Sequence, residues 1–221
     1  MMKMNSIKLV SVITCLLITS CSYNIGHRLG GSIDDSIPEN TIASLEHLLQ
    51  TKKSSFRFLY IELDVRESKD SVLYVFHDED LERMVPLEKY GNKELLNDFV
   101  TINNGAIMFN DLESGVINQI NLSSDSITIP RLQDVLSFIN TKKINKKVYI
   151  EIKDLRSEKA RTRLRELIRL YKDHQEIHLL AFKRNFISSF PEPRKWCNEF
   201  SENGVRVLTI GWHRDLCKKF E

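Results

Sequence analysis

Six apolar segments alternate with amphipathic ones along the chain. Near-continuous apolar runs are typical of strands buried on both faces, as in a parallel sheet, and we expect strands near residues 25, 59, 73, 148, 177 and 205. Apolar residues at helical spacing predict helices over residues 38–49, 130–139 and 160–171, and a further helix near residues 196–200. At the first helix, Asn40 is the expected N-cap. The alternation predicts an α/β fold with parallel strands.

Two stretches depart from this alternation. Residues 85–129 are polar and rich in asparagine, without sustained periodicity, so we expect a long loop excursion with some local structure. Near the N-terminus, Lys3 and Lys8 accompany an apolar run that is too short to span a membrane comfortably. That layout predicts a signal peptide over residues 1–20, followed by one domain over residues 21–221.

Small residues lead directly into Cys21, as in the lipobox of bacterial lipoproteins. We therefore expect an exported bacterial lipoprotein, held on the periplasmic or cell-surface face of a membrane by a lipid anchor on Cys21. The alternative is an ordinary signal peptide with an incidental cysteine. Cys197 and Cys217 are the other cysteines of the mature chain. Export permits a disulfide between them, but the sequence leaves two free thiols equally open.

Composition sets limits on the class of protein. The chain has 221 residues, of which 42% are hydrophobic and 28% charged, and this is sufficient for one sizeable globular core. Its 32 Lys and Arg residues, less Lys3 and Lys8 in the signal peptide, leave 30 against 30 Asp and Glu residues. Without a basic excess, the mature chain is not expected to bind nucleic acid.

Charged side chains cluster where four of the predicted strands end. Because side chains alternate along a strand, Glu62 and Asp64 share one face, and Glu151 shares a face with Lys153. His27 with Arg28, and His77 with Asp78, follow two further apolar runs. In a closed parallel barrel these strand ends meet at one rim, where such enzymes keep their active sites.

The residue types at this rim indicate phosphoryl chemistry. Glu62, Asp64 and Glu151 offer an all-oxygen ligand set, which suits Ca²⁺ or Mg²⁺ better than zinc. Arg28 and Lys153 add positive charge beside that metal, as a phosphate site requires. A pair of histidines, His27 and His77, would then serve as general acid and base, since imidazole titrates near neutral pH.

Each of these residues also has a structural interpretation. A histidine at a strand end is often only structural, and the Glu62–Asp64 pair could form a salt bridge with Arg28 or Arg66. We interpret Glu39 as a helix-start residue and leave it out of the metal set. Asp78 could orient a neighbouring side chain or cap a turn. The remaining histidines are not assigned to the site: His47, His174, His178 and His213. The ordered occurrence of the whole set favours a functional site.

Five segments, taken in order, resemble the glycerophosphodiester phosphodiesterase family: "GHRLGG…PENT", "IELDV", "VFHDEDLER", "IPRLQDVL" and "YIEIK", within residues 25–153. The resemblance implies a TIM-type (β/α)8 barrel that uses a divalent cation to cleave small-molecule glycerophosphodiesters into glycerol phosphate and an alcohol. It also implies His27 and His77 as the acid–base pair, Glu62, Asp64 and Glu151 as metal ligands, and Arg28 and Lys153 as basic residues around the phosphate.

Two departures from the family pattern qualify the resemblance. Leu29 stands between His27-Arg28 and the glycines, where the family has glycine directly after the His-Arg pair. The family's closing strands have no clear match after the segment of residues 209–221. Three explanations stay open: the remaining strands are degenerate, the barrel is shortened at its C-terminal end, or a partner completes it. A non-catalytic binding lipoprotein with a truncated barrel, and a phospholipase D-type enzyme acting on lysolipids, are therefore kept as alternatives.

Overall fold

The computed structural model describes residues 24–102, 106–124 and 126–220. The predicted signal peptide and Cys21 lie outside these residues. Within them, no helix is long and apolar enough to cross a lipid bilayer. The elements follow one another in this order: η2 (His27–Gly30), α2 (Ile42–Lys52), β1 (Ile61–Glu67), β2 (Leu73–Val75), α3 (Asn92–Ile102), η3 (Phe109–Asp111), α4 (Ser114–Ile117), α5 (Leu132–Thr141), β3 (Val148–Asp154), α6 (Glu158–Tyr171), β4 (Ile177–Ala181), α7 (Lys183–Ser189), α8 (Pro193–Glu202), β5 (Val207–Thr209) and η4 (Cys217–Lys219).

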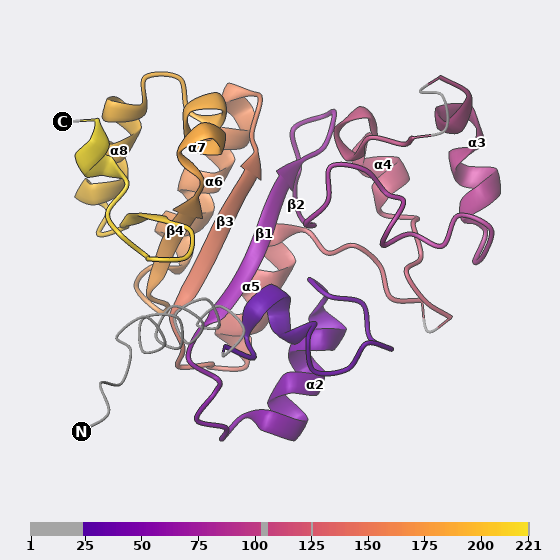
Figure 1. The fold of residues 1–221 in the computed structure, drawn as a ribbon, viewed down its shortest axis with the longest axis horizontal. Helices are drawn as coiled ribbons and strands as arrows, with labels where there is room; N and C mark the ends of the chain where they lie inside the picture. The colour runs from indigo at the N-terminus through magenta and orange to yellow at the C-terminus, as the bar shows by residue number, and fades with distance from the viewer. Residues whose placement is uncertain (1–23, 103–105, 125, 221) are drawn as a thin grey trace, which may run out of the picture.

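A five-stranded sheet with the order β2-β1-β3-β4-β5 runs through the centre of the molecule (Figure 1). Strands β1, β3, β4 and β5 are parallel neighbours, as predicted, and helices connect most of them. The outward face carries Leu63, Ile150 and Leu179, which belong to the main hydrophobic cluster together with residues of α5, α6, α7 and α8. The opposite face carries the charged residues. This arrangement is a segment of a β/α barrel, and within the described residues its edges do not meet.

Two of the predicted strands differ from expectation. The first, near residue 25, is a 3-10 helix, although Gly26 still accepts a hydrogen bond from the Glu62 amide at 2.9 Å. The third, β2, is antiparallel to β1, with Val65 opposite Val75. A parallel connection needs a dozen or more residues, and the residues between Glu67 and Leu73 are too few for one. They form a hairpin instead.

The described part of residues 85–129, which comprises 85–102, 106–124 and 126–129, forms a small lobe rather than a loop. Helices α3 and α4 lie in it, on the side of β2 remote from α6, α7 and α8 (Figure 1). The lobe has its own hydrophobic cluster, which includes Phe109, Ile117 and Ile120 and joins Tyr74 and Phe76 at β2. The polar composition hid this core because its apolar residues come from several short segments.

The segment that follows β5 forms backbone hydrogen bonds with β5 at the edge of the sheet. The Leu216 amide donates to the Val207 carbonyl at 2.8 Å, and the Thr209 amide donates to the Arg214 carbonyl at 2.7 Å. Cys197 in α8 and Cys217 in η4 form a disulfide, so the alternative of two free thiols is excluded in this structure. The disulfide ties the C-terminal segment to α8.

Candidate active site

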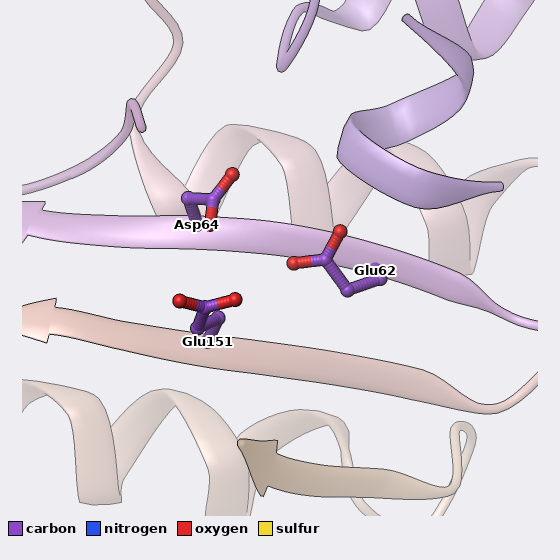
Figure 2. Close-up of side chains that lie close together, drawn as sticks. All are labelled: Glu62, Asp64 and Glu151. Atoms are coloured by element: carbon purple, nitrogen blue, oxygen red, sulfur yellow. The ribbon is translucent and has the colours of Figure 1, made fainter. Parts of the chain in front are cut away.

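Three carboxylates gather on the inner face of β1 and β3. Asp64 and Glu151 are register partners on these neighbouring strands, and Glu62 precedes Asp64 by one alternation on the same face. Figure 2 shows the three side chains together on one side of the two strands. Each offers an oxygen within 4.8 Å of the others, and all three are buried. The structure thus brings together the residues predicted as metal ligands.

The local electrostatics suit a bound cation. Glu62 Oε2 accepts a hydrogen bond from the Arg28 amide at 2.9 Å, whereas its buried Oε1 has no hydrogen-bond partner among the described residues. Burial, followed by the charge of Asp64, raises the pKa of Glu62 well above its ordinary value and also raises the pKa of Glu151. A hard cation bound by these oxygens would relieve both effects.

A tight backbone turn brings His27 and Arg28 to the carboxylates. A Cβ atom on Gly26 would lie 2.0 Å from the Tyr60 carbonyl, so only glycine permits this approach to β1. Arg28 and Leu29 then adopt left-handed conformations with φ of 48° and 58°, which are strained for residues other than glycine. As a result, His27 Nε2 lies 3.6 Å from Glu62 Oε2.

The Arg28 guanidinium reaches two carboxylates. Its Nη1 donates to Glu39 at 2.9 Å, and its Nε lies 3.7 Å from Asp64 Oδ2. Burial and then the charge of Arg28 lower the pKa of His27, which favours its neutral form. The interpretation of Glu39 as a purely helix-start residue is therefore incomplete, because Glu39 also holds Arg28 in place.

His77 returns to the site because of the hairpin. Antiparallel pairing runs β2 back along β1, and the Phe76 amide donates to the Asp64 carbonyl at 3.0 Å. The side chain of Asp78 turns to its neighbour, with Oδ1 at 2.6 Å from His77 Nδ1. Of the two interpretations of Asp78, orienting a neighbouring residue is the one that this contact supports. His77 lies near Glu151 and His27, since a positive charge on its imidazole would lower the pKa of each.

Lys153 lies among the predicted metal ligands. Its ammonium donates to a Glu151 oxygen and is 3.1 Å from Asp64 Oδ1. Residues of one strand face that are two apart lie close together, so Lys153 follows Glu151 into the same cluster. In this structure it is therefore an ion-pair partner of two carboxylates.

Sequence reasoning missed two neighbours of the site. Asn40 was expected to cap α2, but Thr41 is the N-cap and forms a reciprocal capping box with Ser44. Asn40 instead donates from Nδ2 to Asp64 Oδ2 at 2.8 Å and accepts from the Asp64 amide at 3.4 Å. Arg66, considered only as a salt-bridge partner, donates from Nε to the His77 carbonyl at 3.1 Å. The "PENT" motif was the available signal for Asn40.

The unassigned histidines have other partners. His47 Nε2 lies 3.9 Å from Asp34 Oδ2. The rings of His178 and His213 pack against Tyr149, His178 also bonding to Glu176 at 2.9 Å. These contacts account for three of the four histidines without a catalytic role.

Known proteins resemble this chain in both sequence and structure. A glycerophosphodiester phosphodiesterase of Bacillus altitudinis is 30% identical over 118 residues, which are 53% of this chain and 40% of that protein. The crystal structure of glycerophosphodiester phosphodiesterase from Agrobacterium tumefaciens matches with a TM-score of 0.55 and 25% identity, covering 82% of this chain and 64% of the other. A glycerophosphoryl diester phosphodiesterase domain from Mycobacterium tuberculosis matches with a TM-score of 0.53 and 13% identity, covering 82% and 57%.

The chain thus spans less than two thirds of the length of these relatives. The structural likeness confirms the predicted fold class, α/β with the topology of a β/α barrel. The model of the glycerophosphoryl diester phosphodiesterase family matches residues 31–196, so the match begins just after His27 and Arg28 and includes every other predicted site residue except Cys21. On this match, the chain belongs to the glycerophosphoryl diester phosphodiesterase family.

Proposed function

We propose that this chain is a metal-dependent phosphodiesterase that hydrolyses glycerophosphodiesters to glycerol 3-phosphate and an alcohol. The observation that carries the proposal is the buried trio of Glu62, Asp64 and Glu151 with two imidazoles and two basic side chains around it. The family match supports the same chemistry. A phosphodiester carries a negative charge, so it would be attracted to a site that combines a bound cation with the basic side chains of Arg28 and Lys153.

Glu62, Asp64 and Glu151 would hold the divalent cation, and the unpartnered Oε1 of Glu62 supports that assignment. Carboxylate oxygens suit Ca²⁺ or Mg²⁺. When bound, the cation would neutralise charge that develops on the non-bridging phosphate oxygens. Arg28 and Lys153 would bind the same phosphate, the buried Arg28 Nε having no hydrogen-bond partner among the described residues.

His27 and His77 would move the protons. One imidazole takes a proton from the attacking oxygen, which belongs to water or to the neighbouring hydroxyl of the glycerol. The other gives a proton to the leaving alkoxide. A carboxylate only accepts hydrogen bonds, so the contact with Asp78 places a proton on His77 Nδ1 and turns Nε2 into the reactive nitrogen.

The direct test is turnover of glycerophosphocholine by protein that begins at Ser22, with release of glycerol 3-phosphate as the readout. We expect activity with added Ca²⁺ or Mg²⁺ and none in the presence of a chelator. Metal binding without turnover would contradict the proposal and favour the binding lipoprotein. Turnover of a lysolipid but not of the free diester would favour the phospholipase D-type alternative.

We also propose that the mature protein is an exported lipoprotein, anchored through Cys21 after removal of residues 1–20. The disulfide between Cys197 and Cys217 supports export, because such bonds persist in oxidising compartments. The test is incorporation of labelled palmitate in a bacterial host, with Cys21→Ser as the matched variant. We expect the wild type to be labelled, and we expect Cys21→Ser to lose the label and to leave the membrane fraction. A label that survives the substitution would contradict the anchor.

A further inference from the structure

Arg83 bridges two carboxylates at the border of the site. Its Nε donates to Asp78 Oδ2 at 2.7 Å, and its Nη2 donates to Glu39 Oε1 at 2.5 Å. Both carboxylates also hold a residue of the predicted machinery. Asp78 Oδ1 accepts from His77 Nδ1 at 2.6 Å, and Glu39 accepts from Arg28 Nη1 at 2.9 Å.

These contacts form one continuous chain of charge-assisted hydrogen bonds from an acid–base imidazole to a phosphate-binding guanidinium. Burial alone would raise the pKa of Asp78, but the hydrogen bonds from Arg83 and His77 outweigh it and hold that pKa below its ordinary value. Asp78 therefore stays ionised and keeps the proton on His77 Nδ1. Glu39 likewise holds the Nη1 end of the Arg28 guanidinium, whose Nε lies 3.7 Å from Asp64 Oδ2.

The backbone around Arg83 is anchored to the lobe of residues 85–129. Leu81 is fully buried in the lobe's hydrophobic cluster, and its amide donates to the Ile107 carbonyl at 3.0 Å. The Met84 amide closes a turn onto the Leu81 carbonyl at 3.2 Å. Arg83 thus extends from a fixed turn. Its side chain links Asp78, which follows the β1–β2 hairpin, to Glu39, which lies in the loop before α2.

We propose that Arg83 is a positioning residue that fixes His77 and Arg28 relative to each other through Asp78 and Glu39. The inference rests on the proposed phosphodiesterase function and adds a residue whose ion-pair partners, Asp78 and Glu39, lie outside the carboxylate trio. Arginine suits the position because its planar fork presents two separate nitrogens to two acceptors, whereas lysine presents a single centre of charge.

Simple surface ion pairing is the competing explanation, since the Arg83 side chain is 49% exposed. Exposed ion pairs contribute little to stability, so loss of Arg83 should barely change folding under either explanation. Only a positioning role predicts that loss of Arg83 lowers turnover. Arg163 provides a matched control. It is 45% exposed and pairs with Glu166 and Gln133 on another part of the surface.

The experiment compares the wild type with Arg83→Met, Arg83→Lys and Arg163→Met. Misplacement of reacting groups by about 1 Å costs roughly 100-fold in rate, so we expect kcat of Arg83→Met to fall about 10- to 100-fold. The Kd for metal and the melting temperature should stay at the wild-type values. Arg83→Lys should retain an intermediate kcat, guanidinium ion at millimolar concentration should partly restore Arg83→Met, and Arg163→Met should match the wild type. Equal losses in Arg83→Met and Arg163→Met, or an unchanged kcat in Arg83→Met, would overturn the proposal.

A second readout does not need turnover. Nitrogen NMR of the imidazoles should find the Nδ1-protonated tautomer of His77 in the wild type and a mixture of tautomers in Arg83→Met. An unchanged tautomer would overturn the proposal for the His77 arm. If the wild type hydrolyses no diester while the tautomer shifts as expected, the proposed function fails and the positioning role stands.

Discussion

The Lys153 ammonium lies 3.1 Å from Asp64 Oδ1, and it also donates to Glu151. One positive charge therefore partly offsets the negative charge of two of the three carboxylates that are proposed to hold a metal. Binding of a cation there must compete with Lys153, which would release the ammonium for the phosphate. The same residue thus bears on metal affinity and on turnover in opposite directions.

This relationship predicts an asymmetric result for Lys153→Met. Without the ammonium, the carboxylates repel one another in the metal-free protein, so the Kd for Ca²⁺ or Mg²⁺ should fall about 3- to 10-fold, equivalent to roughly 1 kcal/mol. At saturating metal, kcat should also fall, because a phosphate contact is lost. Titration calorimetry and steady-state kinetics measure the two effects. Lys147→Met is the control, since Lys147 precedes β3 and pairs with Glu176 outside the site. Weaker metal binding in Lys153→Met would contradict the prediction.

His77→Ala and Glu62→Gln should separate proton transfer from metal binding. General acid–base catalysis contributes about 10²- to 10⁴-fold, so His77→Ala should lower kcat by at least about 100-fold and leave the Kd for metal nearly unchanged. Glu62→Gln removes a charged ligand and should weaken metal binding first, with activity partly recovered at high metal concentration. Identical behaviour of the two variants would refute this division of roles.

The raised pKa values of Glu62 and Glu151 predict how the stability of metal-free protein depends on pH. Burial, followed by repulsion from Asp64, raises both above their ordinary value of 4.5. The folded state then binds more protons than the unfolded state, so the contribution of this pair to the free energy of unfolding falls as pH rises from 4.5 through the folded pKa values.

Melting curves of chelator-treated protein between about pH 5 and pH 8 measure this decline. Glu62→Gln, which cannot ionise, should flatten the decline and melt at a higher temperature than the wild type at the alkaline end. Added Ca²⁺ or Mg²⁺ should raise the melting temperature of the wild type most where its carboxylates are ionised. A metal-free wild type that gains stability with rising pH over this range would be inconsistent with these shifts.

Much of the site could be predicted because strand alternation is strict. The two-residue period of a strand puts Glu62 and Asp64 on one face of β1. Because β3 is the neighbour of β1 in the sheet, Glu151 then lies beside them. His77 reaches the site by a different route from the one expected, because it follows the second strand of an antiparallel hairpin and not the end of a parallel strand. The shortness of residues 68–72 was a signal that the sequence did offer.

The rest depended on contacts that no local pattern encodes. Asn40 and Thr41 are both good N-caps, and only the reach of Asn40 to Asp64 in the folded chain decides which of them caps α2. Arg83 pairs with Glu39 across a separation of 44 residues. The left-handed turn at Arg28 could not be predicted either, because residues other than glycine rarely adopt it.

Leu29 lies at a position where two physical effects oppose each other. Its φ of 58° is left-handed, which costs about 1–2 kcal/mol for a residue with a Cβ atom. Its side chain is fully buried in the main hydrophobic cluster, and truncation of a buried leucine to alanine costs about 3–5 kcal/mol. Burial therefore outweighs strain and explains how the chain tolerates leucine in this left-handed conformation.

Leu29→Ala keeps the strain and loses the packing, whereas Leu29→Gly loses both. At an ordinary position glycine is less stable than alanine by about 0.5–1 kcal/mol. At Leu29 that order should reverse, with Leu29→Gly destabilised by about 1–4 kcal/mol relative to the wild type and Leu29→Ala destabilised more. Urea unfolding of the three proteins measures the differences in free energy. A glycine variant less stable than the alanine variant would show that the turn at Arg28 and Leu29 carries no strain in solution.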